Sequence, residues 1–129
     1  MSRKGKGINA ERDLIHKFWS NEPWSAVRIA GSGSMKYPSA DILATNKLRK
    51  LAIECKTSKD SSKYIEKDDI KQLKEFAELF NAEPYVAVRF DRKDWLFLTL
   101  EDLEETDKNF MINIEKAEIK GILFEELIK

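Results

Sequence analysis

Apolar residues recur at helical spacing in two stretches of the chain, residues 9–19 and residues 66–80. The first stretch opens on Asn9, a residue type that caps helices well, and the sequence Asn21-Glu22-Pro23 ends it. The second stretch carries one apolar stripe, which consists of Ile70, Leu73, Phe76, Ala77 and Phe80. The spacing therefore predicts two amphipathic helices, each with one face for a core.

The remaining stretches show mostly strand patterns. Residues 24–30 alternate apolar and polar side chains, and residues 38–56 form two short apolar strands around the polar turn Thr45-Asn46-Lys47. Residues 57–63 are polar and are expected to be mobile. The later expected elements are a hairpin over 85–100, a short acidic helix and loop over 101–107, a strand over 110–114 and a terminal helix over 122–128. This order predicts an α/β domain with a mixed central sheet of about five strands and helices on its faces.

Length and composition fit one domain. The 129 residues are enough for a single core, so we expect one domain over 1–129, with the basic segment 1–7 as a flexible arm. No apolar run approaches the roughly 18 residues that suggest a membrane span, so no membrane partner is expected. The single cysteine, Cys55, excludes an internal disulfide and a cysteine zinc site and favours a reducing compartment. We therefore expect a cytoplasmic protein.

Charge is distributed unevenly along the chain. The formal net charge is zero, but residues 1–74 carry 16 Lys or Arg and 9 Asp or Glu, whereas residues 75–129 carry 7 and 14. A neutral total therefore combines a basic half of +7 with an acidic half of −7. Such asymmetry favours a nucleic-acid partner and a nucleoid-associated protein, although faces in space need not follow halves of the sequence.

Charged side chains on the two strands of residues 38–56 are expected to converge. Because side chains alternate along a strand, Glu54 and Lys56 share a face, and pairing of the strands brings Asp41 to that face. Two nearby carboxylates need a cation between them, and an oxygen-rich site suits Mg²⁺, to which the backbone carbonyl of Cys55 could add a ligand. This arrangement supports phosphodiester hydrolysis, with Lys56 offering its charge to the phosphate or the attacking water.

Neighbouring segments have both a functional and a structural reading. Glu11 lies in the first turn of the first helix, where the helix dipole alone favours a carboxylate. Arg12 and Arg28 can meet phosphate or simply be solvated. The loop over 31–38 is rich in Gly and Ser, which allow close approach to phosphate, but it lacks the P-loop spacing and similar stretches are commonly linkers.

The second helix carries residues of two further kinds. Gln72 lies off the apolar stripe and can face the site, whereas Asp69 is expected to be solvated. Phe76 and Phe80, together with the apolar hairpin over 85–100, are candidates for a subunit interface. The alternative is that they fill the core of the monomer.

Taken together, these motifs resemble the PD-(D/E)xK nucleases, and more narrowly the archaeal-type Holliday junction resolvases. The resemblance covers roughly the first 90 residues in family order. It is carried by Arg3-Lys4-Gly5, Gly7-Ile8-Asn9-Ala10-Glu11-Arg12, Val27-Arg28, Ser32-Gly33-Ser34, Pro38-Ser39-Ala40-Asp41-Ile42, Ile53-Glu54-Cys55-Lys56, and Gln72 with Phe76. The chain departs from the family in that Ser39 and Ala40 separate Pro38 from Asp41, so the metal site depends on the register of Asp41.

The resemblance implies a restriction-endonuclease-like fold and a homodimeric, Mg²⁺-dependent endodeoxyribonuclease, in which Mn²⁺ can replace Mg²⁺. Such an enzyme binds four-way DNA junctions by shape and nicks two opposing strands symmetrically, in recombination and repair. It implies Glu11, Asp41 and Glu54 as metal-site acids, with Lys56 and Ser32 as further catalytic residues. The expected DNA-contacting residues are Arg3, Lys4, Lys6, Arg12, Arg28, Ser34, Lys36 and Gln72.

Two other functions fit the same residues. One is a different nuclease of the PD-(D/E)xK superfamily, although the short chain has no added base-reading domain for strong sequence specificity. The other is a non-catalytic DNA-binding module, against which the intact set Glu11, Asp41, Glu54 and Lys56 weighs. The acidic half leaves a clamp or a helicase as a candidate further partner.

Overall fold

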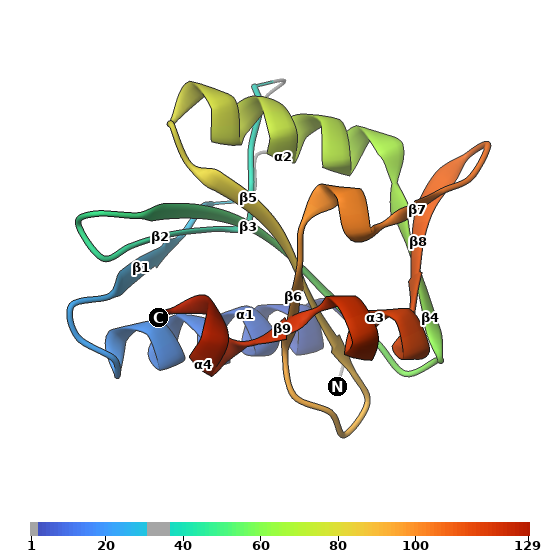
Figure 1. The fold of residues 1–129 in the computed structure, drawn as a ribbon, viewed down its shortest axis with the longest axis horizontal. Coiled ribbons are helices and arrows are strands. Elements are labelled where there is room, and N and C mark those ends of the chain that lie inside the picture. Colours follow the sequence, from blue (N-terminus) through green and yellow to red (C-terminus); the bar gives the residue numbers. More distant parts are fainter. Residues whose placement is uncertain (1–2, 31–36) are drawn as a thin grey trace.

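A mixed sheet runs through the middle of the molecule. The computed structural model describes residues 3–30 and 37–129. Within them, the six strands of this sheet, in spatial order, are β1 (Ser25–Arg28), β2 (Ile42–Thr45), β3 (Lys50–Ser58), β5 (Glu83–Phe90), β6 (Leu96–Leu98) and β9 (Ile122–Leu123). β3 and β5 are parallel, and all other neighbours are antiparallel. The prediction of a mixed α/β sheet is confirmed, and the two-residue β9 adds a strand to the five expected (Figure 1).

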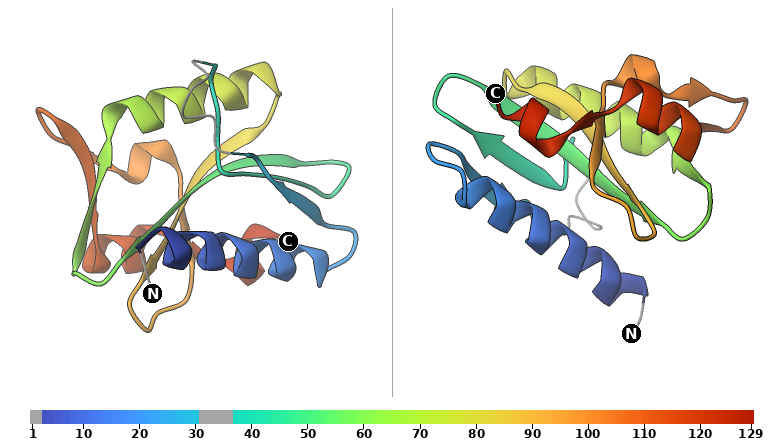
Figure 2. Two further views of the ribbon diagram at one scale, coloured as in Figure 1. Left: turned by 180° about the vertical axis from the view of Figure 1, so that it is seen from behind. Right: turned by 60° about the horizontal axis from the view of Figure 1, so that its bottom comes forward.

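Helices cover both faces of this sheet. α1 (Arg3–Trp19) and α4 (Phe124–Leu127) lie on one face, and α2 (Lys67–Leu79) lies on the other (Figures 1 and 2). The core on the α1 face includes Leu14, Phe18, Ile42 and Ile53, each fully buried. The core on the α2 face is built in the same way from Ile70, Leu73, Phe76 and Ala77 against Ala52, Val86 and Val88. Both expected helices therefore form, each buried along its apolar stripe.

A second, smaller sheet stands beside the first. It has the order β4-β8-β7, with β4 (Ser62–Glu66), β8 (Asn109–Asn113) and β7 (Glu104–Glu105) all antiparallel. The short helices η1 (Leu100–Asp102) and α3 (Ile114–Lys120) flank it in the chain. The small sheet adds the buried side chains Ile65 and Ile112 to the α2-side core.

Several expected boundaries were wrong. The structure has helix from Arg3, so residues 3–7 of the expected flexible arm belong to α1. Arg and Lys favour a helix here and no proline interrupts it, although Gly5 and Gly7 disfavour it. Residues 57–63 are not a mobile segment: β3 continues to Ser58 and β4 begins at Ser62, where pairing with β8 compensates for the polar sequence. The expected helix over 122–128 begins as strand β9.

The apolar hairpin formed by β5 and β6 is used inside the chain. Val86, Val88, Phe90, Phe97 and Leu98 are each at most 1% exposed, so they fill the two cores and cannot serve as an interface. On α2, Phe76 is also buried and is excluded from a subunit interface. Only the end of that helix keeps exposed apolar side chains. Across the described residues, every helix is too short or too polar to cross a membrane.

Candidate active site

Asp41 and Glu54 face each other across two antiparallel strands. Asp41 lies directly before β2, where its N–H donates to the carbonyl of Ile53 (3.0 Å) and its carbonyl accepts from Ile29 (2.8 Å). The register pairs Ile42 with Ile53, so Asp41 lies opposite Glu54 and their side chains share a face. One Asp41 carboxylate oxygen also accepts from the Cys55 N–H at 2.8 Å. The two residues between Pro38 and Asp41 therefore leave the register of Asp41 intact.

Lys56 is held between two carboxylates on the same face. Its Nζ lies 3.4 Å from Glu54 Oε2 and 3.0 Å from Asp69 Oδ2. Asp69 comes from the first turn of α2, which packs over β3. The expectation that Asp69 is solvated was wrong, because the packing of α2 turns this carboxylate toward Lys56. The sequence did hold a signal for this placement: Asp69 lies three residues before Gln72, which was expected to face the site, and residues i and i+3 share a helix face.

Burial and mutual repulsion determine the protonation of these groups. Burial raises the pKa of Glu54 to about 8, and the nearby Asp41 carboxylate adds to this effect. Burial likewise raises the pKa of Asp41, although the hydrogen bond from Cys55 opposes the shift. Burial disfavours the charged ammonium of Lys56, but Glu54 and Asp69 outweigh it and raise the pKa of that lysine. The site therefore combines a stable cation with two carboxyls that resist simultaneous ionisation.

A small pocket opens beside this cluster. It has a volume of about 170 Å³, and Asp41, Glu54, Asp69 and Gln72 line it together with the segments around Ile29 and Ser39. The Gln72 amide donates to Asp68 at 2.7 Å, which fixes its orientation at the rim. Since one water occupies about 30 Å³ of liquid, the pocket has room for an ion and several waters.

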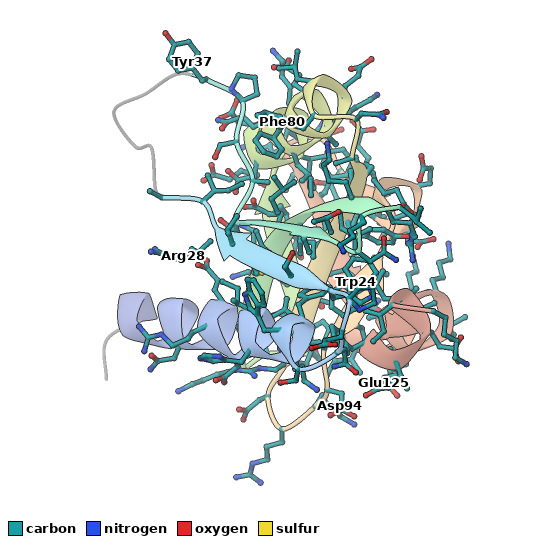
Figure 3. The ribbon with its side chains drawn as sticks, turned by 90° about the vertical axis from the view of Figure 1, so that its left-hand side faces the viewer. Trp24, Arg28, Tyr37, Phe80, Asp94 and Glu125 are labelled. Atoms are coloured by element: carbon teal, nitrogen blue, oxygen red, sulfur yellow. The ribbon has the colours of Figure 1, made fainter. Side chains whose placement is uncertain are left out.

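Glu11 and Arg28 form a pair next to the pocket. Arg28 Nε donates to Glu11 Oε2 at 3.0 Å, which joins β1 to α1, and Figure 3 shows Arg28 on this side of the molecule. The Glu11 side chain is only 17% exposed, and its charge contributes to the raised pKa of Asp41. Glu11 is therefore close enough to act on the site electrostatically, while its own partner is a cation.

The other expected contact residues are placed only in part. Arg12 is exposed on α1. Arg3, Lys4 and Lys6 belong to the first two turns of the same helix. Ser32, Ser34 and Lys36 lie outside the described residues.

A divalent cation is compatible with the donor set. Within residues 3–30 and 37–129, no group of three Asp, Glu, His or Cys side chains lies close enough together to coordinate a metal ion. Asp41 and Glu54 nevertheless offer carboxylate oxygens at one place, and each has a raised pKa that a neighbouring positive charge would lower. Oxygen donors of this kind suit Mg²⁺, which usually binds one or two carboxylates and keeps several waters.

Comparison with known proteins gives consistent matches over nearly the whole chain. The family model described as archaeal Holliday junction resolvase (Hjc) matches residues 2–129. The chain is 42% identical over 130 residues to the crossover junction endodeoxyribonuclease Hjc of Archaeoglobus fulgidus, covering 95% of each protein. It is 35% identical over 123 residues to the Hjc of Methanocaldococcus jannaschii, covering 95% of this chain and 86% of that protein.

A solved structure is also similar. The Archaeoglobus fulgidus Hjc structure, described as a Holliday junction resolvase from an archaeal hyperthermophile, matches with a TM-score of 0.89 and 37% identity. The match covers 95% of this chain and all of that one. The similarity thus extends through the acidic C-terminal part, beyond the segment in which the sequence motifs lie.

Proposed function

This chain belongs to the archaeal Holliday junction resolvase (Hjc) family, and from that premise we propose how its residues cut DNA. It is a crossover junction endodeoxyribonuclease whose substrate is four-way junction DNA. The observation that carries the proposed chemistry is the placement of Asp41 opposite Glu54, with Lys56 on the same face of the sheet.

In the proposal, Asp41 and Glu54 hold Mg²⁺, with the Cys55 carbonyl as a further ligand and Mn²⁺ as a substitute ion. The support is that both carboxyls are buried and resist ionisation together, so a divalent cation would relieve their repulsion. When bound, the ion polarises the phosphodiester and lowers the pKa of the attacking water. Glu11 belongs to the same acidic set through its effect on Asp41, and it also orients Arg28.

Lys56 serves as the fixed positive charge of the site. Its raised pKa keeps the ammonium charged at the pH of cutting, and its two carboxylate partners restrict where the ammonium points. A positioned cation stabilises negative charge that develops on a phosphate in the transition state. Asp69 touches no reacting atom in this scheme and acts as a positioning residue for Lys56.

Symmetric cutting requires two copies of this site, and we propose a homodimer. A four-way junction has near two-fold symmetry, so a two-fold dimer can present two sites at a fixed separation. The end of α2 supports this, because Leu79 and Phe80 are 73% and 47% exposed and Phe80 stacks on Phe76 with ring centroids 4.3 Å apart. Figure 3 shows where Phe80 lies. From the DNA substrate we also propose that the protein is associated with the nucleoid, and a clamp or helicase stays a candidate partner.

The decisive variant is Asp41→Asn, which keeps an oxygen that can accept from the Cys55 N–H. Wild type should nick a four-way junction in Mg²⁺ and not in EDTA, and should leave a linear duplex of the same sequence intact. The variant should bind the junction and lose nicking by about a hundredfold or more, since removal of a metal-site carboxylate removes most of the charge stabilisation.

Asp107→Asn, an exposed substitution of the same kind, should nick like wild type. Asp41→Ala extends the series by removing the acceptor as well. Normal nicking by Asp41→Asn in Mg²⁺ would contradict the proposed chemistry, and equal cutting of junction and duplex by wild type would contradict junction selectivity.

A further inference from the structure

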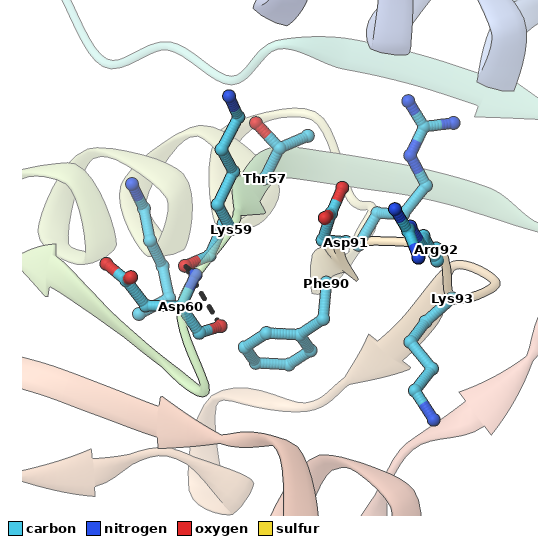
Figure 4. Close-up of a pocket in the computed structure, with 10 residues that line it drawn as sticks. Thr57, Lys59, Asp60, Phe90, Asp91, Arg92 and Lys93 are labelled. Atoms are coloured by element: carbon cyan, nitrogen blue, oxygen red, sulfur yellow. Dashed lines mark hydrogen bonds between the residues drawn. The ribbon is translucent and has the colours of Figure 1, made fainter.

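A basic cavity lies at the end of the parallel strands β3 and β5, and it shares no lining residue with the small pocket of the active site. It has a volume of about 790 Å³ and is formed by the ends of β3 and β5, the segments that follow them, and the start of β4. Five of its ten lining side chains are basic, and two are acidic. The basic ones are Lys59, Lys63, Arg89, Arg92 and Lys93. Figure 4 shows Lys59 on one side, Arg92 and Lys93 on the other, and the ring of Phe90 between them.

Within the described part of the chain, four of these cations have no ion-pair partner. Arg89 is occupied, because it lies 3.8 Å from Asp13 and over the ring of Trp95. Lys59, Lys63, Arg92 and Lys93 make no ion pair with any residue that the structure describes, although other basic side chains, such as Arg49 with Glu83, do. Unpaired like charges on one concave surface raise the local positive potential and attract an anionic ligand.

The walls of the basic cavity are held by the backbone. The Asp91 N–H donates to the Ser58 carbonyl at 2.9 Å, which ties the turn after β5 to the end of β3. The Lys93 N–H donates to the Phe90 carbonyl at 3.0 Å and closes the turn, in which Arg92 takes the left-handed conformation (φ 60°). Phe90 is 1% exposed and forms a rigid base. The cations are therefore presented by a defined surface.

The basic cavity continues from the active site along one strand. Glu54, Lys56 and Ser58 alternate onto the same face of β3, and Ser58 lines the basic cavity. Two residues of strand span about 7 Å. Phosphates of one DNA strand rise by about 3.4 Å per nucleotide along the helix axis, so a duplex with its axis parallel to β3 would advance by about two nucleotide steps over this distance.

We propose that the basic cavity binds the DNA backbone phosphates that flank the bond being cut. This inference rests on the proposed function, because it takes Lys56 as the position of the scissile phosphate. A cavity with several separate cations is larger than one free phosphate requires and suits a polyanion. Lys59, Lys63, Arg92 and Lys93 thereby become DNA-binding residues, and none of them belongs to the motifs of the first 56 residues.

The test is the salt dependence of junction binding, measured by fluorescence anisotropy in EDTA, where no cutting occurs. The double variant Arg92→Gln/Lys93→Gln should bind about tenfold more weakly per side chain near 0.1 M salt. The slope of log K against log salt is negative, and its magnitude should decrease by about 2 for each protomer engaged. Lys59→Gln, on the opposite wall, should decrease the magnitude of the slope by about 1.

Lys108→Gln/Lys120→Gln removes two exposed cations elsewhere and serves as the matched control, with unchanged slope expected. Unchanged affinity and slope in the cavity variants would overturn the inference. A second outcome would also overturn it. If inorganic phosphate at constant ionic strength raised the Tm of wild type but not of the double variant, while both proteins bound the junction equally, the cavity would bind free phosphate and not DNA.

The inference and the proposed function fail separately. If wild type nicks junctions in Mg²⁺ but the cavity variants keep the wild-type slope, the proposed chemistry stands and the basic cavity is not a phosphate site. If wild type fails to nick but the slope falls in the variants, the basic cavity binds DNA and the proposed chemistry is wrong.

Discussion

At the scale of single residues, Lys56 links the acids of the site. It contacts Glu54 on its own strand and Asp69 on α2, while Asp41 faces Glu54 from the neighbouring strand. Strand alternation and register were enough to place Asp41, Glu54 and Lys56 together from the sequence. Asp69 could not be placed in this way, because its position depends on how α2 packs across β3, and local periodicity does not determine that packing.

The role of Asp69 is testable by Asp69→Asn. Loss of the 3.0 Å ion pair should leave Lys56 with one carboxylate partner and a wider range of positions. We expect single-turnover nicking at saturating protein to slow by about tenfold to a hundredfold, because small misplacements of catalytic groups have effects of this size. Junction affinity should change little. Glu78→Gln, on an exposed position of the same helix, is the control, and equal rates for both variants would remove Asp69 from the mechanism.

The raised pKa of Glu54 predicts a pH-dependent stability. The folded, metal-free protein keeps a proton on Glu54 up to about pH 8, whereas the unfolded chain releases it near its ordinary pKa. Stability should therefore fall as pH rises from about 5 to about 8, in the same direction as the effect of Asp41. Thermal unfolding in EDTA should show this decline for wild type and a flatter profile for Glu54→Gln.

Magnesium provides the complementary measurement. Since Mg²⁺ competes with protons for carboxylates, it should raise the Tm of wild type more at pH 8 than at pH 5.5. Parallel pH profiles of wild type and Glu54→Gln, or an equal effect of Mg²⁺ at both pH values, would show that Glu54 is not the titrating group.

At the scale of elements, long periodic segments were predictable and short ones were not. α2, β3 with Glu54, and β2, which directly follows Asp41, show clear apolar patterns, so their existence could be predicted from those patterns. β4, β9 and α3 were missed, because two to seven residues carry little periodicity and form through contacts with distant segments. In α3 the one local signal is Asn113, whose side chain accepts from the Lys116 N–H.

Two glycines give opposite predictions at this scale. A Cβ at Gly121, after α3, would lie 2.5 Å from the Ala117 carbonyl oxygen and 3.2 Å from Leu96 Cβ. Gly121→Ala should therefore destabilise the protein by about 1–3 kcal/mol. Gly7 lies in α1 with nothing within 4 Å of such a Cβ, so Gly7→Ala should stabilise by about 0.5–1 kcal/mol. Urea unfolding measures both, and a loss of stability in Gly7→Ala would contradict the extension of α1 to Arg3.

At the scale of the whole molecule, two cores enclose the sheet, while ten large apolar side chains among the described residues stay at least 37% exposed, Leu79 and Phe80 among them. The distribution of charge along the sequence indicated a nucleic-acid partner, but it could not show that the cations near Arg92 gather at one cavity, because that cavity joins segments about thirty residues apart. The same limit applies to the interface, since sequence periodicity does not distinguish a buried Phe76 from an exposed Phe80.

Assembly is tested by Phe80→Asp. An exposed aromatic side chain at the centre of an interface contributes strongly to association, so a charge there should convert the proposed dimer to monomer in sedimentation analysis. Ile119→Asp places the same charge on α3, at a side chain that is 81% exposed, and should leave the dimer intact. We expect the monomer to lose paired nicking before it loses junction binding. A dimer that persists in Phe80→Asp would move the interface away from α2.

The continuity of β3 has a consequence for where the enzyme cuts. One unbroken strand of nine residues supplies Glu54 and Lys56 to the chemistry and Ser58 to the basic cavity. The distance between the bond that is cut and the nucleotides bound in the basic cavity is therefore set by the backbone of β3, and it does not depend on the base sequence of the DNA. A single inserted residue after Lys56 would turn Ser58 to the opposite side of the sheet and disconnect anchoring from scission, while leaving the reacting groups themselves in place.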